Sequence, residues 1–318
     1  MPPQRVDVIS FTRAETDRYF DDLIVRSAGV NRWYHTREPA PVDMQAVVRM
    51  NRDTLYSSAI VDVSQGATLT MPQTSGRYQT AMVVDQDHYI GHVFDSPGEC
   101  RLEAAMFPTS HVALAVRTLV DPADPADLAD VAALQDQLRI EAHSAEAPSH
   151  PAWDTDSLDE TRALLMKLAA GVNAFDGAFG SRRETDPILH LLGTAAGWGG
   201  LPTRQATYIG VSPELPVGHY VLQVPRDVPV RGFWSVSVYN SEGYFEPNEA
   251  GRYSVNSVTA VRDPDGGVTI NLGGDASLPN AIPLPEGWNY TVRLYQPEPE
   301  ILDKTWSFPT LSQPHQGP

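Results

Sequence analysis

LTMPQTSGRYQTAMVVDQDHYI, residues 69–90, reads as a short strand, a turn and a second strand that ends in polar residues. The β-branched and aromatic residues predict the strands, and the Pro, Ser and Gly between them predict the turn. The pattern recurs as LQVPRDVPVRGFWSVSVYNSEGYF at residues 222–245. The sequence therefore predicts a similar pair of strands in each half of the chain.

The two stretches also agree residue by residue, after a two-residue insertion in the second. The matched positions are Pro72 with Pro225, Tyr78 with Phe233, Asp85 with Asn240, Tyr89 with Tyr244 and, farther along each half, Arg117 with Arg293. The spacing is too long for a solenoid repeat. We favour a duplicated β-domain; chance similarity between two unrelated β-meanders is the alternative.

The rest of the chain divides by the period of its apolar residues. An amphipathic helix is predicted over 12–28, with Thr12 and Glu15 as a capping box. Further helices are predicted after Asp124 and Pro125, after a capping box at Ser157 and Glu160, and after Asp186 and Pro187. We expect an α+β, mostly β protein with a helical lead-in (1–40), a β-domain (41–122), a helical insert (123–200) and a second β-domain (201–318).

Composition narrows the classes of partner. The 318 residues carry a formal charge of -17, which disfavours binding to nucleic acid and to anionic membranes and also serves solubility. Apolar runs are too short to span a bilayer, and the start resembles no secretory signal. Cys100 is the single cysteine, so an internal disulfide is excluded. We expect a cytoplasmic protein that binds a small molecule; homo-oligomers remain compatible with the sequence.

Two long motifs resemble a known pair of domains. NRDTLYSSAIVDV (51–63) with GRYQTAMVVDQDHY (76–89) is similar to the N-terminal module called domain of unknown function 1254. RGFWSVSVYNSEGYFEPNEAGRYSVNS (231–257), WNYTVRLYQP (288–297) and DKTWSFPTL (303–311) resemble its companion, domain of unknown function 1214. The resemblance implies two β-rich, jelly-roll-like parts around a helical insert, and family members are often labelled hydrolases or carboxylesterases.

Several common catalytic motifs are missing from the chain. It contains no GxSxG, no GxxxxGK[ST], no HExxH and no GxGxxG after a strand. We therefore expect no nucleotide cofactor and no resident metal, and any catalysis would use the protein's own acid and base groups.

The first candidate site is the start of the strand at 51–58. A turn would explain Asn51 and Asp53, but it leaves Arg52 and Tyr56 unexplained. Asp53 and Tyr56 supply a carboxyl and a hydroxyl, which general acid/base catalysis uses, and Asn51 and Arg52 could bind substrate. The alternative is a buried polar network that closes one end of the sheet.

The second candidate site is the polar segment that follows the strand in the first hairpin. Asp85, Asp87, His88 and His92 lie within eight residues, so they supply the side-chain types of either an acid/base pair or a metal site. We assign Asp85 and His88 as catalytic candidates and assign no metal. A polar strand end without function is the alternative.

Aromatic and arginine side chains complete the candidates. Tyr and Trp suit a ligand cleft, although most such residues fill β-sandwich cores. Arginine presents a planar fork that can hold a carboxylate, although pairing with Asp or Glu is commoner. The proposed substrate-binding residues from these classes are Arg77, Tyr78, Tyr89, Trp198, Trp234, Arg252 and Tyr253.

These observations favour a cofactor-independent enzyme that acts on a small organic molecule by acid/base chemistry. Hydrolysis is the first expected reaction class and elimination by a lyase is the second. Two alternatives stay open: a protein that binds a small molecule without turnover, and a metal-dependent enzyme at Asp85 and His88.

Overall fold

The computed structural model describes residues 2–45, 48–172 and 174–313, and the chain divides into two compact units. Unit 1 comprises residues 1–37, 55–120 and 125–203, and unit 2 comprises 38–54, 121–124 and 204–318. Each unit thus includes a stretch of chain that leads into the first long strand of the other unit's sheet. The two stretches are residues 38–54, which belong to unit 2, and the residues just before 204, which belong to unit 1.

Unit 1 is built on two open sheets. The larger has the strand order β1-β2-β7-β4-β5 and the smaller has the order β6-β3-β8. Apolar side chains from both sheets, among them Val61, Leu69, Val83 and Leu114, form a common core. The strand bounds are β1 Tyr34–His35, β2 Thr54–Asp62, β3 Ala67–Met71, β4 Gln79–Asp85, β5 His92–Phe94, β6 Gly98–Leu102, β7 His111–Leu119 and β8 Arg139–Ala142.

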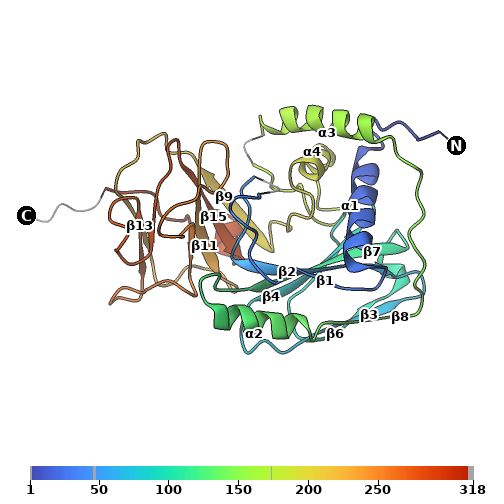
Figure 1. Ribbon diagram of the computed structural model, residues 1–318, viewed down its shortest axis with the longest axis horizontal. Helices are drawn as coiled ribbons and strands as arrows, with labels where there is room; N and C mark the ends of the chain where they lie inside the picture. Colours follow the sequence, from blue (N-terminus) through green and yellow to red (C-terminus); the bar gives the residue numbers. More distant parts are fainter. Residues whose placement is uncertain (1, 46–47, 173, 314–318) are drawn as a thin grey trace, which may run out of the picture. The chain divides into compact units, whose positions relative to one another are not determined.

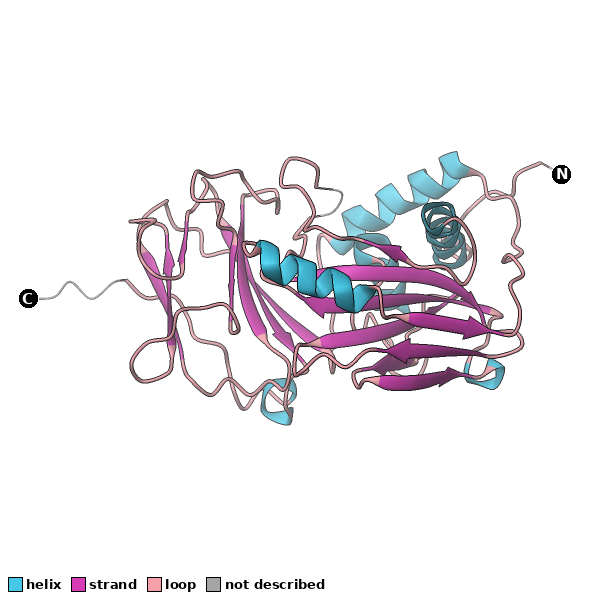
Figure 2. Ribbon diagram, turned by 60° about the horizontal axis from the view of Figure 1, so that its bottom comes forward, coloured by secondary structure: helices cyan, strands magenta, loops and turns pink. Residues whose placement is uncertain are grey.

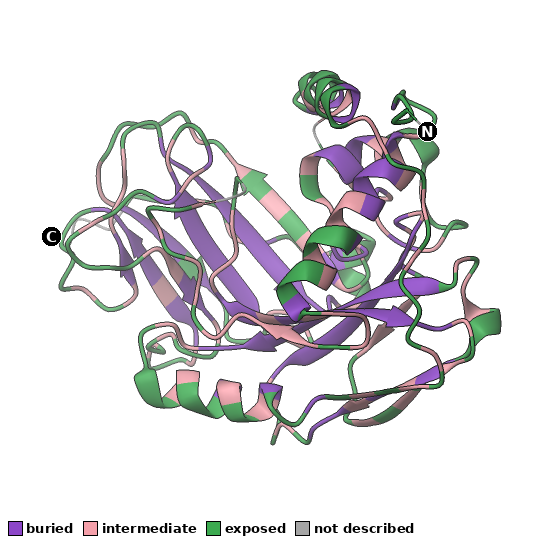
Figure 3. Ribbon diagram, turned by 45° about the vertical axis from the view of Figure 1, so that its right-hand side comes forward, coloured by how far each residue is buried: buried purple, intermediate pink, exposed green. Residues whose placement is uncertain are grey.

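Helices cover the other face of the larger sheet in unit 1. Helices α1 (Phe11–Ser27), α3 (Thr155–Ala169) and α4 (Pro187–Gly197) share an apolar cluster, and they lie together on one side of β2, β4 and β7 (Figure 1). Helix α2 (Pro125–Gln135) lies on the opposite side of that sheet (Figure 2). The central strands are buried along their length, whereas α2 is largely exposed (Figure 3).

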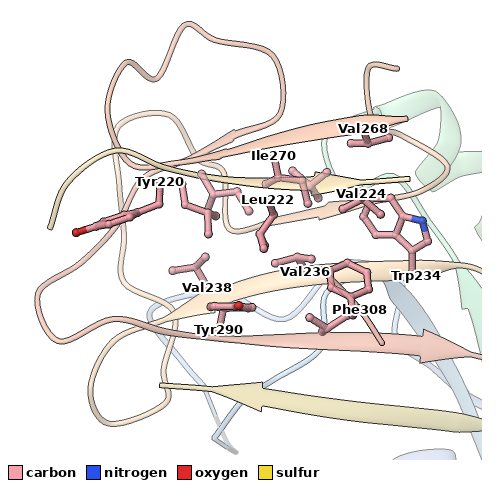
Figure 4. Close-up of a cluster of buried hydrophobic side chains, with 14 of the residues drawn as sticks. Tyr220, Leu222, Val224, Trp234, Val236, Val238, Val268, Ile270, Tyr290 and Phe308 are labelled. Carbon is pink, nitrogen blue, oxygen red and sulfur yellow. The ribbon is translucent and has the colours of Figure 1, made fainter. Parts of the chain in front are cut away.

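Unit 2 pairs a four-stranded sheet of order β12-β11-β15-β9 with a three-stranded sheet of order β10-β13-β14. Trp234, Val236 and Val238 of β11 point toward Leu222 and Ile270 of the smaller sheet (Figure 4). The bounds are β9 Ala206–Val211, β10 Tyr220–Val224, β11 Trp234–Tyr239, β12 Ser254–Asn256, β13 Val268–Leu272, β14 Ala281–Ile282 and β15 Asn289–Tyr295, with the short helix α5 at Pro299–Leu302.

The two strand pairs that contain the matched arginines have the same register. In unit 1, Thr80 of β4 lies opposite Arg117 of β7, and in unit 2, Ser235 of β11 lies opposite Arg293 of β15. The strand order β2-β7-β4-β5 corresponds to β9-β15-β11-β12, and β3 pairs with β6 as β10 pairs with β13. The smaller sheets differ in their third strand, because β8 is antiparallel to β3 whereas β14 is parallel to β13.

The turns after β4 and β11 have the same hydrogen bonds. Asp85 Oδ1 accepts from the backbone N–H groups of Asp87 and Tyr89, both at 2.9 Å. Asn240 Oδ1 accepts from the N–H groups two and four residues on, at 3.1 and 3.0 Å. An amide thus makes in unit 2 the bonds that a carboxyl makes in unit 1, so this turn does not require a charge.

Most of the long elements agree with the sequence-based expectations. The mostly β, α+β class is confirmed, as are the long strands of both units and the helix cap at Asp186, whose side chain accepts from the N–H groups of Ile188 and Leu189. Two capping boxes were wrong. Helix α1 begins at Phe11 after Ser10, and α3 is capped by Asp154, so the proposed boxes at Thr12 and Ser157 lie inside the helices.

We predict that Gly273→Ala destabilises unit 2 by roughly 2–5 kcal/mol, because strain and a backbone clash add together. Gly273 has φ of 72°, and an added Cβ would collide with the Gly218 carbonyl oxygen. Gly251 has a similar φ of 61° but open space around it, so Gly251→Ala should cost only about 1–2 kcal/mol. Urea unfolding measures both, and equal losses would contradict the clash.

Candidate functional site

Strands β11 and β15 of unit 2 are buried on both faces, and the two faces differ in chemistry. Trp234, Val236 and Val238 face the apolar core (Figure 4), so the alternate residues of the same strands face away from it. The side chains on that second face are polar, and together with the neighbouring strand β12 they form what we call the polar layer: Ser235, Ser237, Tyr239, Ser254, Asn256, Thr291, Arg293 and Tyr295.

Arg293 lies at the centre of the polar layer and is 3% exposed. Its guanidinium donates to Ser237 Oγ at 2.9 Å and to Tyr239 Oη at 2.6 Å. It also donates to the Arg49 carbonyl oxygen at 2.8 Å. Burial alone would lower the pKa of Arg293, but Tyr239, Tyr295 and Asp53 outweigh it and raise the pKa. Arg293 therefore stays cationic and attaches residues 49–54, here called the arm, to the polar layer.

Asp53 lies at the end of the arm and is 1% exposed. Its Oδ1 accepts from Ser254 Oγ at 3.5 Å, while its Oδ2 has no hydrogen-bond partner among the described residues. Burial raises the pKa of Asp53, and Arg293, Ser235, Asn256 and Ser254 oppose this rise in turn. A carboxyl in such surroundings can exchange a proton closer to neutral pH than an exposed aspartate does.

Two hydroxyl oxygens of the polar layer share this lack of partners. Thr291 Oγ1 is buried without a hydrogen bond to any described residue. Within the described part of the chain, no hydrogen bond of normal geometry is made by Ser235 Oγ or Asp53 Oδ2, although Ser235 lies near enough to Asp53 to lower its pKa. Native proteins satisfy nearly all buried polar atoms with protein, water or ligand, so these atoms are where a buried water or a small polar molecule would make contact.

The arm also arranges three of the other predicted residues. Asn51 Oδ1 accepts from the Asp53 N–H at 2.8 Å, and Asn51 Nδ2 donates to Tyr295 Oη at 3.1 Å. Arg52 lies half-buried with its guanidinium 5.5 Å from the centre of the Tyr253 ring, and it donates to the Ala40 carbonyl oxygen. The structure thus brings Asn51, Arg52, Asp53 and Tyr253 together.

Asp85 lies in unit 1 and is 4% exposed. Burial raises its pKa to about 6, with a smaller contribution from Asp87, while the N–H groups of Tyr89 and Asp87 and the charge of Arg13 oppose this. Asp53 belongs to unit 2, so the two carboxyl groups are built into different units. Their action as one acid/base pair stays a prediction.

His88 is fully buried in a column of stacked rings in unit 1. Its Nε2 accepts from the Gly199 N–H at 2.9 Å, and its Nδ1 lies 2.8 Å from Thr194 Oγ1. The rings follow the order Tyr19, Trp198, His88, His190 and Tyr89, with centroid separations of 4.4–5.4 Å. Burial lowers the pKa of His88 well below its usual value, and His190 adds to this. With both ring nitrogens occupied, His88 is a neutral packing residue in this structure.

The remaining candidates in unit 1 make specific contacts of their own. Arg77 donates to both carboxylate oxygens of Asp127, at 2.9 and 2.5 Å, so its fork is already occupied. The Tyr56 ring lies 5.2 Å from the Arg117 guanidinium. The Tyr78 hydroxyl lies 3.1 Å from Thr80 Oγ1.

Two further candidates belong to unit 2 but lie outside the polar layer. Trp234 packs in the apolar core against Phe308, and Arg252 is exposed and donates to the Ala276 carbonyl oxygen at 3.2 Å. The structure therefore does not bring all the predicted substrate-binding residues into one place.

Sequence reasoning missed several members of the polar layer. Arg293 was noted only as the match of Arg117, and Ser235, Asn256 and Thr291 were not proposed at all. A signal was present, because SVSVY and TVRLY alternate apolar residues with polar ones inside strands that are flanked by other strands. Period-two alternation normally predicts a solvent-facing side, so the pattern does not distinguish a buried polar layer from an exposed face.

A metal site is not supported by side-chain geometry. Across residues 2–45, 48–172 and 174–313, no group of three or more His, Cys, Asp or Glu side chains converges as ligands would. Every helix of these same residues is too short or too polar to cross a bilayer.

The fold and polar layer define a mostly β, α+β protein of two units. Residues 30–99 match the family model "Protein of unknown function (DUF1254)", and residues 216–299 match "Protein of unknown function (DUF1214)". The resemblance expected from the sequence is confirmed, since the chain carries both regions in the expected order. No curated protein matches the chain significantly.

Two solved structures share the fold. The VPA0106 protein from Vibrio parahaemolyticus aligns with a TM-score of 0.71 and 18% identity, covering 96% of this chain and 97% of that one. A putative uncharacterized protein from Burkholderia cenocepacia aligns with a TM-score of 0.54 and 16% identity, covering 95% and 87%. Both similarities concern the fold alone.

We predict that Asp85→Asn makes the protein more stable above pH 6. Because the folded pKa is raised, the stabilisation from protonated Asp85 is complete below about pH 4 and is lost as pH rises through about 6. The asparagine variant escapes this loss and should gain roughly 1–3 kcal/mol at pH 7.5 relative to pH 4.5. Urea unfolding at both pH values measures the gain.

In the matching turn of unit 2, the opposite substitution can be made, from asparagine to aspartate at residue 240. Asn240→Asp places a carboxyl on the same backbone N–H groups at a half-buried position, so it should fold. An Asp85→Asn variant that loses stability equally at both pH values would contradict the assigned pKa.

Proposed function

We propose that this protein is a cofactor-independent enzyme in which Asp53 acts as the acid/base group on a small organic substrate. Hydrolysis of an ester, lactone or amide is the first reaction class, and elimination is the second. The observation that carries the proposal is the Asp53 carboxyl, buried beside Arg293 with one oxygen unpartnered. A buried carboxyl with a free oxygen and a raised pKa is what proton transfer at neutral pH requires.

The groups around Asp53 suit a reaction in which negative charge develops on an oxygen of the substrate. Arg293 is a fixed positive charge beside Asp53, held by its hydrogen bonds to the hydroxyl oxygens of Ser237 and Tyr239. A fixed positive charge stabilises negative charge that develops on an oxygen during acyl transfer or elimination. Ser235 Oγ is buried beside Asp53 without a hydrogen bond of normal geometry to any residue that the structure describes, so it could donate to Asp53 or to a substrate oxygen.

A protein that binds a small molecule without turnover is the second candidate. The observation in its favour is that Arg293 already donates to Ser237, Tyr239 and the Arg49 carbonyl, as expected of a structural cation. In that case a ligand would satisfy the unpartnered oxygens without exchanging protons. Binding of a test compound without its conversion would favour this candidate.

We also propose that the two units descend from a duplicated, jelly-roll-like β-domain. The shared register around Arg117 and Arg293, the shared strand order and the shared turn at Asp85 and Asn240 support this origin. The helices of unit 1 would then be insertions into one copy. Under this proposal, Asn240 shows that the turn itself tolerates an amide at the position of Asp85.

We predict that Asp53→Asn lowers kcat by about 10²–10⁴-fold, because the amide keeps the shape but cannot exchange a proton. A panel of esters, lactones and amides serves as substrate, and Tm is measured in parallel. Tm should be unchanged or higher, since a carboxyl with a raised pKa is removed. Asp227→Asn, at an exposed position of the same unit, is the matched control and should keep full activity.

The opposite pattern would show a structural role for Asp53. Loss of a buried partner of Arg293 would destabilise the fold by roughly 3–5 kcal/mol and lower Tm. Full activity in Asp53→Asn would end the acid/base proposal. Asp85→Asn in the same assay tests whether the carboxyl of unit 1 contributes to turnover.

A further inference from the structure

The arm and the polar layer carry a local charge that is opposite to that of the whole chain. They contain three arginines, Arg49, Arg52 and Arg293, but a single carboxyl group, Asp53. The formal charge of the chain is -17, so most of its surroundings favour cations. Arg293 is already engaged by Ser237, Tyr239 and the Arg49 carbonyl oxygen, so Arg52 is the cation of this region to consider for binding an anion.

Among the described residues, no carboxylate lies within 4 Å of the guanidinium of Arg52. Several other arginines do have a carboxylate within that distance: Arg13, Arg18, Arg37, Arg77, Arg162, Arg226 and Arg231. Burial lowers the pKa of Arg52, and the Tyr253 ring only partly opposes this. An anion bound to Arg52 would provide a negative charge beside its guanidinium and would raise its pKa again.

The geometry of Arg52 leaves most of its donors available to a ligand. Among the described residues, its guanidinium makes one hydrogen bond, to the Ala40 carbonyl oxygen, and it lies near the Tyr253 ring. A guanidinium has five N–H donors in a planar fork that matches the two oxygens of a carboxylate. Contact with an aromatic ring keeps that fork in a fixed orientation, which reduces the entropy lost on binding.

Arg52 and Asp53 are adjacent in the chain, and their contacts are with two residues of unit 2 that are also adjacent in the chain. Tyr253 contacts Arg52, and Ser254 donates to Asp53. Arg52 is half-buried and Asp53 is fully buried, so the arm presents a cation toward its accessible side and a carboxyl toward its buried side. Arg52 is therefore the more accessible charged group of the arm, and it directly precedes the proposed acid/base residue in the chain.

We propose that the substrate carries a carboxylate, which Arg52 binds through its guanidinium fork. This proposal rests on the function proposed for Asp53 and names its substrate class. Neutral esters and amides without a carboxylate would then be poor substrates. Arg77 is excluded from this role because Asp127 occupies its fork.

The test compares small acids with their primary amides, such as benzoate with benzamide and lactate with lactamide, by calorimetry and by shift in Tm. The native protein should bind at least one acid roughly 10- to 100-fold more tightly than its amide, as a charge-assisted hydrogen bond allows. Arg52→Gln should bring that ratio close to one, and Arg52→Lys should leave it intermediate because the charge remains without the fork.

Arg226→Gln is the matched control, because Arg226 is an exposed arginine of the same unit, and the ratio should not change in it. For any panel compound that is turned over, Arg52→Gln should raise KM more than it lowers kcat. Equal binding of acids and amides, or no binding of any acid at millimolar concentration, would overturn the proposal.

The Asp53→Asn variant separates this proposal from the proposed function. If the substrate class is correct but Asp53 is not the acid/base group, the preference for acids persists in the native protein while Asp53→Asn remains active. If the substrate class is wrong, the preference for acids is absent even though Asp53→Asn loses activity. Each proposal can therefore fail alone.

Discussion

The buried guanidinium of Arg293 is the interaction on which unit 2 depends. A cation at 3% exposure is unfavourable unless its donors are satisfied, and here Ser237, Tyr239 and the Arg49 carbonyl satisfy them. The polar layer and the attachment of the arm follow from this requirement. Asp53 is buried as a consequence, because it lies four residues after the carbonyl that Arg293 holds.

In unit 1, the buried guanidinium of Arg117 is stabilised by different contacts. Arg117 is 7% exposed, lies in the same register as Arg293, and donates to the Gly199 carbonyl at 2.8 Å. Its sheet face is covered by helices and by the ring column, and its strand neighbours there include Met82. Each arginine thus binds the backbone of a segment that leads into a strand of the other unit's sheet, and in unit 2 the arginine also contacts the hydroxyl groups of Ser237 and Tyr239.

The candidate site could be predicted only in part. Asn51, Arg52 and Asp53 were recognisable because a turn does not need an arginine beside it, and the structure does bring them together. Asp85 and His88 looked equally reactive in sequence, yet Asp85 Oδ1 accepts two backbone bonds of a turn and His88 has both nitrogens occupied. Residue type does not reveal whether a polar atom is satisfied, since the partners of His88 lie more than a hundred residues away.

Local periodicity determined the strands, the main helices and the mostly β class, because those depend on contacts between near neighbours and on side-chain alternation. The family resemblance came from the long motifs of both halves. The tertiary structure alone decided which face of β11 and β15 is polar and buried, and that Arg52 lies against Tyr253 without a carboxylate partner among the described residues. Both depend on long-range pairing: Ser235 meets Arg293 across the sheet, and Arg52 meets Tyr253 about two hundred residues away. Burial of a charge is a property of these assembled surroundings, so no stretch of sequence contains it.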